Sequence, residues 1–180
     1  LGEFGHTVKL MSPQFVKPYL KTNKHDMVDA EEICEAVNRP NMRFVPIKNI
    51  EQQAILSVHR ARQGFVKART AQANRMRGLL SEFGIVMPQG IRSIINRMPD
   101  ILEDAENGLP GTMRWLLERL NNHLKKLDRQ VKELEFQIKL WHKENEASQR
   151  LEGIPGIGPI TASAIVATVG NAAEFKNGRQ

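Results

Sequence analysis

Residues 117–141, LERLNNHLKKLDRQVKELEFQIKLW, carry the clearest periodicity in this chain of 180 residues. Large apolar side chains recur at alternating steps of three and four, which is the pattern of a helix that buries one stripe against a partner helix. The stripe consists of Leu117, Leu120, Leu124, Leu127, Val131, Leu134, Ile138 and Trp141. We therefore predict a long helix. Its partner is either an earlier helix folded back on it or the same helix of a second subunit.

Residues 50–83 are the candidate for the helix that folds back. They also repeat apolar side chains at helical spacing, and Gly84 and Pro88 follow as stop signals. No acidic residue occurs between Gln52 and Ser81, and residues 51–100 hold eight basic and three acidic side chains, nearly all of the formal charge of +6. Such an excess is typical of a surface that contacts phosphates. The candidate contacts are Arg60, Arg62, Lys67, Arg69, Arg75 and Arg77. The alternative is a solvated basic face.

A second candidate contact lies in LEGIPGIGPITASAIVA, residues 151–167. The stretch predicts a helix, a tight turn and a second helix that starts at Pro159, where the missing proline N–H costs nothing. Gly156 and Gly158 give the turn backbone freedom and allow a phosphate to approach N–H groups at a helix N-terminus. The alternative is a plain turn between helices without a ligand.

The N-terminal part offers a candidate metal site. Residues 6–13 predict a short strand, and residues 26–37 predict a helix with Asp26 and Asp29 near its start. A spacing of three places both carboxylates on one helix face, where they can hold Mg²⁺. The alternative is that they only suit the positive end of the helix dipole.

Several classes of site are excluded by composition. The single cysteine, Cys34, excludes an intrachain disulfide and a cysteine-based zinc site, and the five histidines lack metal-ligand spacing. No apolar run approaches the roughly 18 residues that a membrane span needs. These features predict a cytoplasmic protein that binds no membrane.

Three stretches together resemble one family. They are KLMSPQFVKPYLKTNKHDMVDAEEICEA, NRMRGLLSEFGI and LEGIPGIGPITASAIVATVGNAAEFKNGRQ, and the sequence resembles the DEDD insertion-sequence transposases, relatives of the Piv/MooV DNA invertases, over essentially its whole length. The resemblance implies a mainly α chain with three parts. Residues 1–48 would be the last strand and helix of a RuvC-like, RNase H-fold domain, residues 49–147 a basic helix and a coiled-coil region, and residues 148–180 the start of a C-terminal domain with a helix-hairpin-helix-like motif.

The resemblance also implies an activity and partners. Asp26 and Asp29 match the last two acidic residues of the D-E-D-D set that binds Mg²⁺ and positions the scissile phosphate. DNA is the expected substrate, which implies a bacterial, nucleoid-associated protein. A structured bridge RNA guides many members, and the coiled coil implies a homo-oligomer. The remaining members of the acidic set have no match within this chain, because Glu3 stands in the wrong context, and the family's nucleophilic serine has none either, because Ser163 lies in the packing helix.

The expected function is DNA transposition by a transposase of which this chain, alone, is inactive. Two alternatives remain open at this point. The chain is a non-catalytic nucleic-acid-binding and dimerisation module, or it is a purely structural coiled coil that shows no salt-dependent binding of nucleic acid.

Overall fold

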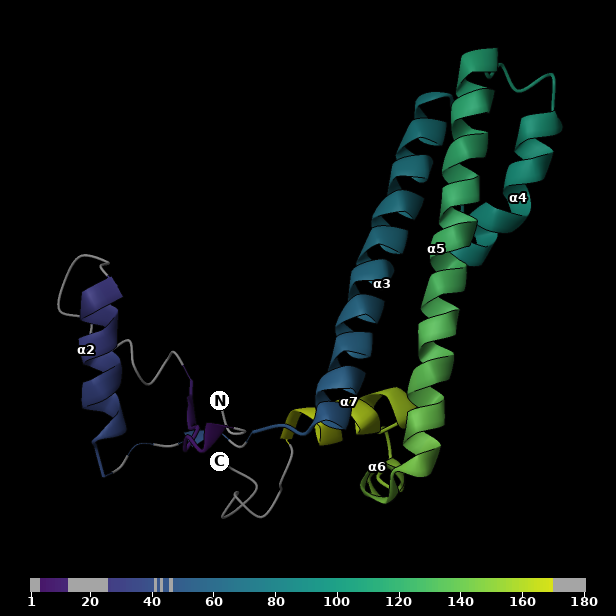
Figure 1. The fold of residues 1–180 in the computed structure, drawn as a ribbon. Helices are drawn as coiled ribbons and strands as arrows, with labels where there is room; N and C mark the ends of the chain where they lie inside the picture. The colour runs from purple at the N-terminus through teal and green to yellow at the C-terminus, as the bar shows by residue number, and fades with distance from the viewer. Residues whose placement is uncertain (1–3, 13–25, 41, 43, 46, 170–180) are drawn as a thin grey trace. The chain divides into compact units, whose positions relative to one another are not determined.

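The computed structural model describes residues 4–12, 26–40, 42, 44–45 and 47–169, without the side chains of residues 26–29 and 32. The chain is mainly helical, as predicted (Figure 1). It divides into two units, one formed by Leu1–Ile50 with Gly170–Gln180 and one formed by Glu51–Val169. Among the described residues, no helix has the length and apolar character that crossing a membrane requires.

The smaller unit contains two short strands and a helix. Strand β1 (Leu10–Met11) pairs antiparallel with β2 (Phe44–Val45), and helix α2 (Asp26–Val37) lies between them in sequence. The predicted strand and helix are confirmed, although the strand is shorter than expected. β2 was not predicted, since two residues carry no periodic signal. The ammonium of Lys9 lies 4.7 Å from the centroid of the Phe44 ring, which adds a cation–π contact to the strand pair. Membership of a RuvC-like domain stays a prediction.

The larger unit is built on two long helices, α3 (Ile50–Glu82) and α5 (Gly111–Glu144), which run antiparallel side by side (Figure 1). Of the two predicted partners for the apolar stripe of α5, the structure therefore shows the earlier helix of the same chain, folded back on it. Helix α3 ends at Glu82, and Gly84 follows as the predicted stop signal, because a φ of +75° suits glycine and the Ile85 N–H donates to the Leu80 carbonyl. Two ion pairs fix the register of the two helices, Arg62 with Glu135 and Arg69 with Asp128.

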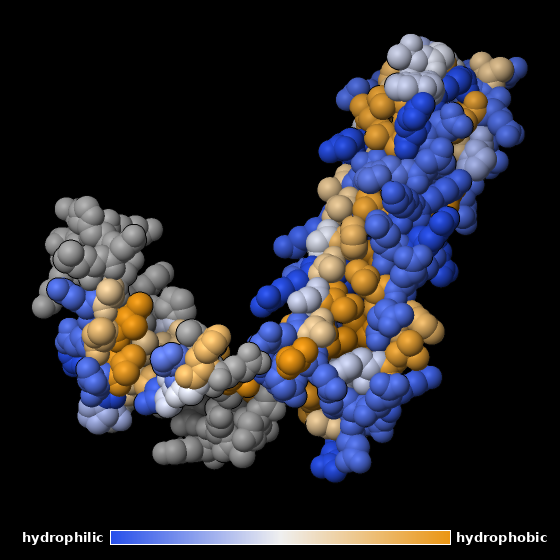
Figure 2. Space-filling view, in the orientation of Figure 1, coloured by the Kyte–Doolittle hydropathy of each residue, from blue (hydrophilic) through white to orange (hydrophobic). Residues whose placement is uncertain are grey.

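The predicted apolar stripe of α5 forms its packing face. Leu117, Leu124, Leu127, Val131 and Ile138 are buried, and the other three members are half-buried. Asn121 is buried beside the half-buried Leu120, because a helix of 3.6 residues per turn drifts relative to a seven-residue repeat. Figure 2 shows apolar side chains along the line between the long helices and hydrophilic ones over the rest of this face.

Helix α4 (Ile91–Glu103) packs on α5 and closes the main core. The sequence predicted only a short helix around residues 91–98, but the helix continues through Pro99 to Glu103. A proline inside a helix costs about 3 kcal/mol. Burial of Ile94, Met98 and Ile101 offsets this cost, because each buried aliphatic side chain contributes about 1.5–3 kcal/mol.

Arg114 of α5 closes the C-terminus of α4. Its guanidinium donates to the carbonyls of Ile101, Leu102, Asp104 and Leu109 and to the Asn107 side chain. The carbonyls of Ile101, Leu102 and Asp104 are among the backbone groups that the end of a helix leaves without partners. The contact explains why the 104–110 connection holds a fixed geometry without regular structure.

Two short helices complete the larger unit. Helix α6 (Glu146–Glu152) follows α5 directly, and α7 (Pro159–Val169) packs against both α5 and α6. A second, smaller core joins three helices through Ile55 of α3, Ile138 of α5 and Ala167 of α7. The predicted helix, turn and helix of residues 151–167 are thus present, and the second helix starts at Pro159 as expected.

Candidate nucleic-acid interface

The basic residues of α3 lie on two faces of the helix. Arg62 donates to Glu135 Oε1 from Nε at 2.9 Å and from Nη2 at 2.5 Å, and Arg69 donates from Nη1 to Asp128 Oδ1 at 2.6 Å. Only 25% and 22% of these two arginine side chains is exposed. Both cations are already neutralised by carboxylates of α5, so their geometry serves the helix pair. Their predicted contact with nucleic acid stays a prediction that this geometry does not favour.

Arg77 and Arg75 lie toward the C-terminal half of α3. Arg77 donates to the carbonyls of Pro88 and Gly90 at 3.3 and 2.9 Å and to Asn74 Oδ1 at 3.0 Å, which ties the loop before α4 to α3. Arg75 is exposed and makes one long hydrogen bond of 3.3 Å to Gln72. Arg77 therefore has a structural task, whereas Arg75 keeps most of its hydrogen-bonding capacity.

The outer face of α3, formed by Arg60, Gly64, Lys67, Ala71 and Arg75, points away from α5 and is exposed throughout. Within the described part of the chain, Arg60 and Lys67 form no ion pair. Small residues separate the cations, and a Cβ added at Gly64 would meet nothing within 4 Å. This face has the charge and the open backbone that contact with a polyanion requires.

The hairpin between α6 and α7 is exposed and geometrically well defined. Gly156 has a φ of +89°, a conformation that favours glycine, and the Ile157 N–H donates to the Ile154 carbonyl at 3.0 Å. Gly158 is exposed, and a Cβ there would meet nothing within 4 Å. Its carbonyl accepts from the Ala162 N–H at 2.9 Å and so starts α7. The first N–H groups of α7 have no partner inside the helix.

Two histidine–serine contacts hold the hairpin helices in place, and neither was predicted. His142 Nδ1 lies 2.7 Å from Ser148 Oγ, and its Nε2 lies 2.9 Å from Glu152 Oε2. Both His142 and Ser148 are buried, so this contact fixes α6 to the end of α5. A histidine and a serine six residues apart form no recognised motif, which is why spacing could not reveal this role.

The second contact joins α3 to α7. His59 Nε2 lies 3.1 Å from Ser163 Oγ, which also donates to the Ile160 carbonyl. Burial, and then the nearby Arg62 charge, lower the pKa of His59. Ser163 is completely buried, in agreement with the expectation that it lies in a packing helix.

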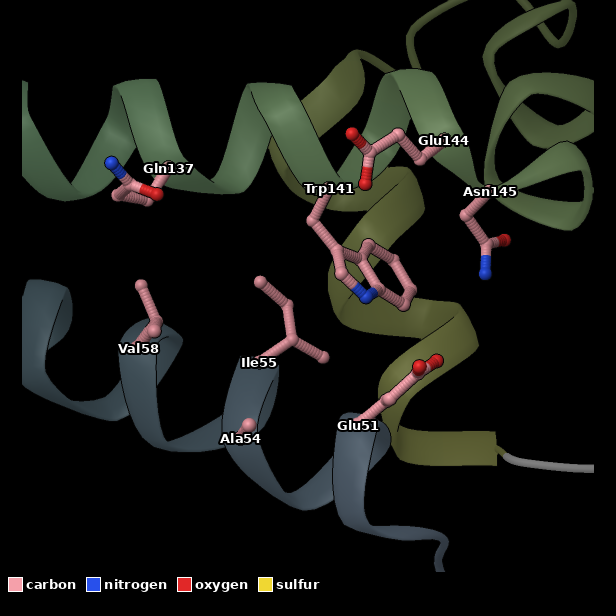
Figure 3. A pocket seen from close by; sticks show the side chains of 8 residues that line it. All are labelled: Glu51, Ala54, Ile55, Val58, Gln137, Trp141, Glu144 and Asn145. Atoms are coloured by element: carbon pink, nitrogen blue, oxygen red, sulfur yellow. The ribbon is translucent and has the colours of Figure 1, made fainter.

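A hollow of about 500 Å³ opens between the start of α3 and the end of α5 (Figure 3). Trp141 points from α5 toward α3, opposite Ile55, with the carboxylates of Glu51 and Glu144 nearby. The hollow was not predicted. It borders the small core and contains none of the predicted site residues.

The predicted metal site is only partly described. Asp26 begins α2 and Asp29 follows within its first turn, but both side chains lie outside the described part of the structure. Helical backbone at i and i+3 agrees with two carboxylates on one face. One or two carboxylates together with substrate phosphates are a usual ligand set for Mg²⁺. Elsewhere in the described residues, no cluster of three or more His, Cys, Asp or Glu side chains is arranged to hold a metal.

Comparison with known proteins gives two family matches. Residues 3–85 match a family described as "Transposase", and residues 148–180 match one described as "Transposase IS116/IS110/IS902 family". Together the two matches cover well over half of the chain. No solved structure matches it.

Curated relatives match along the whole chain. A "Probable family 20 transposase" of Pseudomonas aeruginosa is 46% identical over 100% of this chain and 54% of its own length. The transposase for insertion sequence element IS1328 of Yersinia enterocolitica is 43% identical over 99% of this chain and 53% of its own length. The transposase for insertion sequence element IS1111A of Coxiella burnetii is 40% identical over 98% of this chain and 48% of its own length. The chain thus spans about half the length of the curated relatives it matches, and it belongs to the IS116/IS110/IS902 family of transposases.

Proposed function

We propose that the chain is part of an insertion-sequence transposase that recombines DNA, and that its larger unit holds nucleic acid by phosphate contacts. The observation that carries the proposal is the similarity to named transposases along the whole chain. The outer face of α3 and the hairpin supply two surfaces suited to this task. Neither surface reads sequence, because phosphate contacts position a nucleic acid without specifying its bases.

On the outer face of α3, Arg60, Lys67 and Arg75 are the cations best placed for phosphates. They are exposed, spaced along one side, and free of carboxylate neighbours on their own helix from Gln52 to Ser81. At the hairpin, Gly156 and Gly158 would let a phosphate approach the N-terminus of α7 in the manner of a helix-hairpin-helix motif. A guiding RNA would use the same chemistry as DNA at both surfaces.

Asp26 and Asp29 would hold Mg²⁺ in the complete transposase. When bound, Mg²⁺ would neutralise charge on the scissile phosphate and orient it. The two aspartates of this chain would contribute by binding the ion from one helix face, and further carboxylates would have to come from the rest of the protein. We therefore expect this chain alone to bind nucleic acid without cutting it.

A non-catalytic binding and dimerisation module is the second candidate. The binding half of that reading agrees with the exposed cations. Assembly through the apolar stripe of α5 is less favoured, because α3 and α4 already cover that stripe within one chain. An oligomer would need another face of the molecule.

Salt-dependent binding tests the role of α3. The affinity of the chain for a fluorescein-labelled 20-base-pair duplex, and for an RNA of the same length, would be measured by anisotropy between about 50 and 200 mM salt. Each phosphate contact contributes about 0.9 to the slope of log K against log salt on duplex DNA. The double variant Arg60→Ala/Lys67→Ala should therefore make this negative slope shallower by about 1.8 and weaken binding.

The matched control is Lys139→Ala/Lys143→Ala on α5, which removes the same charge from exposed positions of the other long helix. The control should keep most of the slope. Equal losses in both double variants would show that only net charge matters and would refute a specific role of α3. Absence of binding to either nucleic acid at 50 mM salt would refute the proposed function of the chain.

A further inference from the structure

A groove of about 530 Å³ lies between α4 and α5, away from the outer face of α3 and from the hairpin. Pro99 and Leu102 of α4 form one wall, and Trp115, Asn121 and Lys125 of α5 are among the residues that form the other. The groove therefore combines an apolar wall, an aromatic ring, an amide and a cation. None of these side chains serves the contacts proposed above.

Trp115 is the first unusual feature of the groove. It is 55% exposed although it stands beside the main core, and the Arg119 guanidinium lies 5.1 Å from the centroid of its ring. The Trp115 ring is therefore a flat apolar surface that is open to solvent and has a cation beside it. Flat aromatic surfaces of this kind stack on nucleobases, at about 1–3 kcal/mol per base.

Asn121 is the second unusual feature of the groove. It is 4% exposed, and its Oδ1 has no hydrogen-bond partner within the described part of the chain. Buried side-chain oxygens are nearly always paired, and an unpaired one costs about 1–3 kcal/mol. Asn121 lines the groove but its Oδ1 is covered, so the amide must turn about its Cβ–Cγ bond before a bound molecule can supply the missing donor. An asparagine amide pairs well with adenine, which offers an N–H group beside a ring nitrogen.

The charges around the groove favour a neutral ring inside it and a phosphate outside. Glu103 and Glu118 also line the groove and would repel a buried anion. Arg114 lines it too, but its guanidinium already donates to backbone carbonyls at the end of α4. Lys125 is exposed at the groove and Arg119 is exposed beside Trp115, so both cations can meet a phosphate at the rim. Within the described residues, Lys125 forms no ion pair that would compete.

We propose that this groove holds one unpaired base of a single-stranded nucleic acid, and that adenine fits it best. The ring stacks on Trp115, and Lys125 contacts the adjoining phosphate. The Asn121 amide turns toward the groove, and an exocyclic N–H of the base donates to its Oδ1. The inference rests on the proposed function and adds to it a site that recognises a base, whereas the outer face of α3 and the hairpin recognise only the backbone.

The test compares strands that differ only in their bases. Anisotropy would give the affinity of the chain for labelled ten-unit strands of deoxyadenylate, riboadenylate, deoxythymidylate and an abasic deoxyribose phosphate of the same charge. Trp115→Ala should weaken binding of the adenine strands roughly 10-fold and leave the abasic strand unchanged. Phe136→Ala is the matched control, because Phe136 is also on α5, is 58% exposed and does not line the groove.

A second variant separates binding from folding. Asn121→Leu removes an unpaired buried oxygen, so it should leave the melting temperature unchanged or raise it. The same variant should weaken adenine strands several-fold, toward the affinity for thymidylate. A preference for only one of the two adenine strands would identify whether DNA or RNA supplies the base, and either preference supports the groove.

Three results would overturn the inference: equal binding of base-bearing and abasic strands by the unaltered chain, no effect of Trp115→Ala, or equal losses in Trp115→Ala and Phe136→Ala. Failure here leaves the proposed function intact if the abasic strand still binds with a salt-dependent affinity. If no strand binds, both proposals fail.

Discussion

The ion pair between Arg69 and Asp128 should contribute measurably to the stability of the helix pair. Asp128 accepts from Arg69 at 2.6 Å through Oδ1 and meets Lys132 at 2.7 Å through Oδ2. Asp128→Asn keeps the shape of the side chain and removes its charge. Arg69 would then be left mostly buried without its carboxylate, and its Nε already lacks a partner among the described residues.

The expected cost follows from how far the pair is buried. Exposed pairs contribute about 0–1 kcal/mol, whereas breaking a fully buried pair costs about 3–5 kcal/mol. The Arg69 and Asp128 side chains are 22% and 16% exposed, between these limits, and Lys132 is 66% exposed and adds little. We expect Asp128→Asn to cost about 2 kcal/mol. For a chain of this size that cost lowers the melting temperature by about 4–8 °C.

The effect should depend on pH in one direction. Burial raises the pKa of Asp128, but hydrogen bonds from Lys132 and Arg69 outweigh it and hold the pKa below its ordinary value of 3.8. The stabilisation is therefore fully present well above pH 3.8 and is lost as the pH falls through the lower pKa of the folded chain. The difference between the unaltered chain and Asp128→Asn should shrink in acid.

Urea unfolding followed by circular dichroism would measure the difference at pH 7 and pH 3. Glu133→Gln is the matched control, because Glu133 is an exposed acidic residue of the same helix. Arg69→Met/Asp128→Leu should recover much of the lost stability, since a well-packed apolar pair often replaces a buried ion pair without cost. Equal effects of Asp128→Asn and Glu133→Gln at pH 7, or a difference that does not change with pH, would refute the reasoning.

Two further predictions concern glycine and histidine. Gly64→Ala should stabilise the chain by about 0.5–1 kcal/mol, because the site is helical and open. Gly156→Ala should destabilise it by about 1–2 kcal/mol, because the φ of Gly156 is +89°. Urea unfolding of both variants measures the two changes in stability, and changes of the same sign would contradict the argument. Burial and the Arg62 charge lower the pKa of His59 below 6.5. The unaltered chain should therefore lose stability relative to His59→Gln as the pH falls below 6.5. Thermal melting of both proteins between pH 7.5 and pH 5 measures the difference, and melting temperatures that change in parallel with pH would contradict the prediction.

The long helices were predictable because each repeats its apolar residues many times. The strand β2 was not, because two residues cannot establish a period. Pro99 hid the second half of α4, since a proline inside a helical pattern usually marks its end and only the packed core shows that the helix continues. Local signals therefore sufficed for elements of several turns and failed where burial outweighed a local preference.

The candidate interface was predictable in composition but not in detail. Six basic residues of α3 were treated as one set, whereas Arg62 and Arg69 face α5 and Arg60 and Lys67 face outward. A signal did exist in the sequence. Arg62 and Arg69 fall at seven-residue steps between the buried Ile55 and Met76, and Asp128 and Glu135 are also seven residues apart. Matching these two steps would have separated the paired cations from the exposed ones.

Helix α5 is continuous from Gly111 to Glu144, so it holds the groove near its start and the hairpin helices at its end at a fixed distance from each other. At 1.5 Å per residue, about 35 Å separates Asn121 in the groove from the end of α5, where the hairpin helices attach. That length is close to one turn of a B-form duplex, about 34–36 Å. A nucleic acid that touches both ends must match this fixed spacing. The spacing can change only if α3 and α5 are lengthened together, because their ion pairs and shared core fix the register of the two helices.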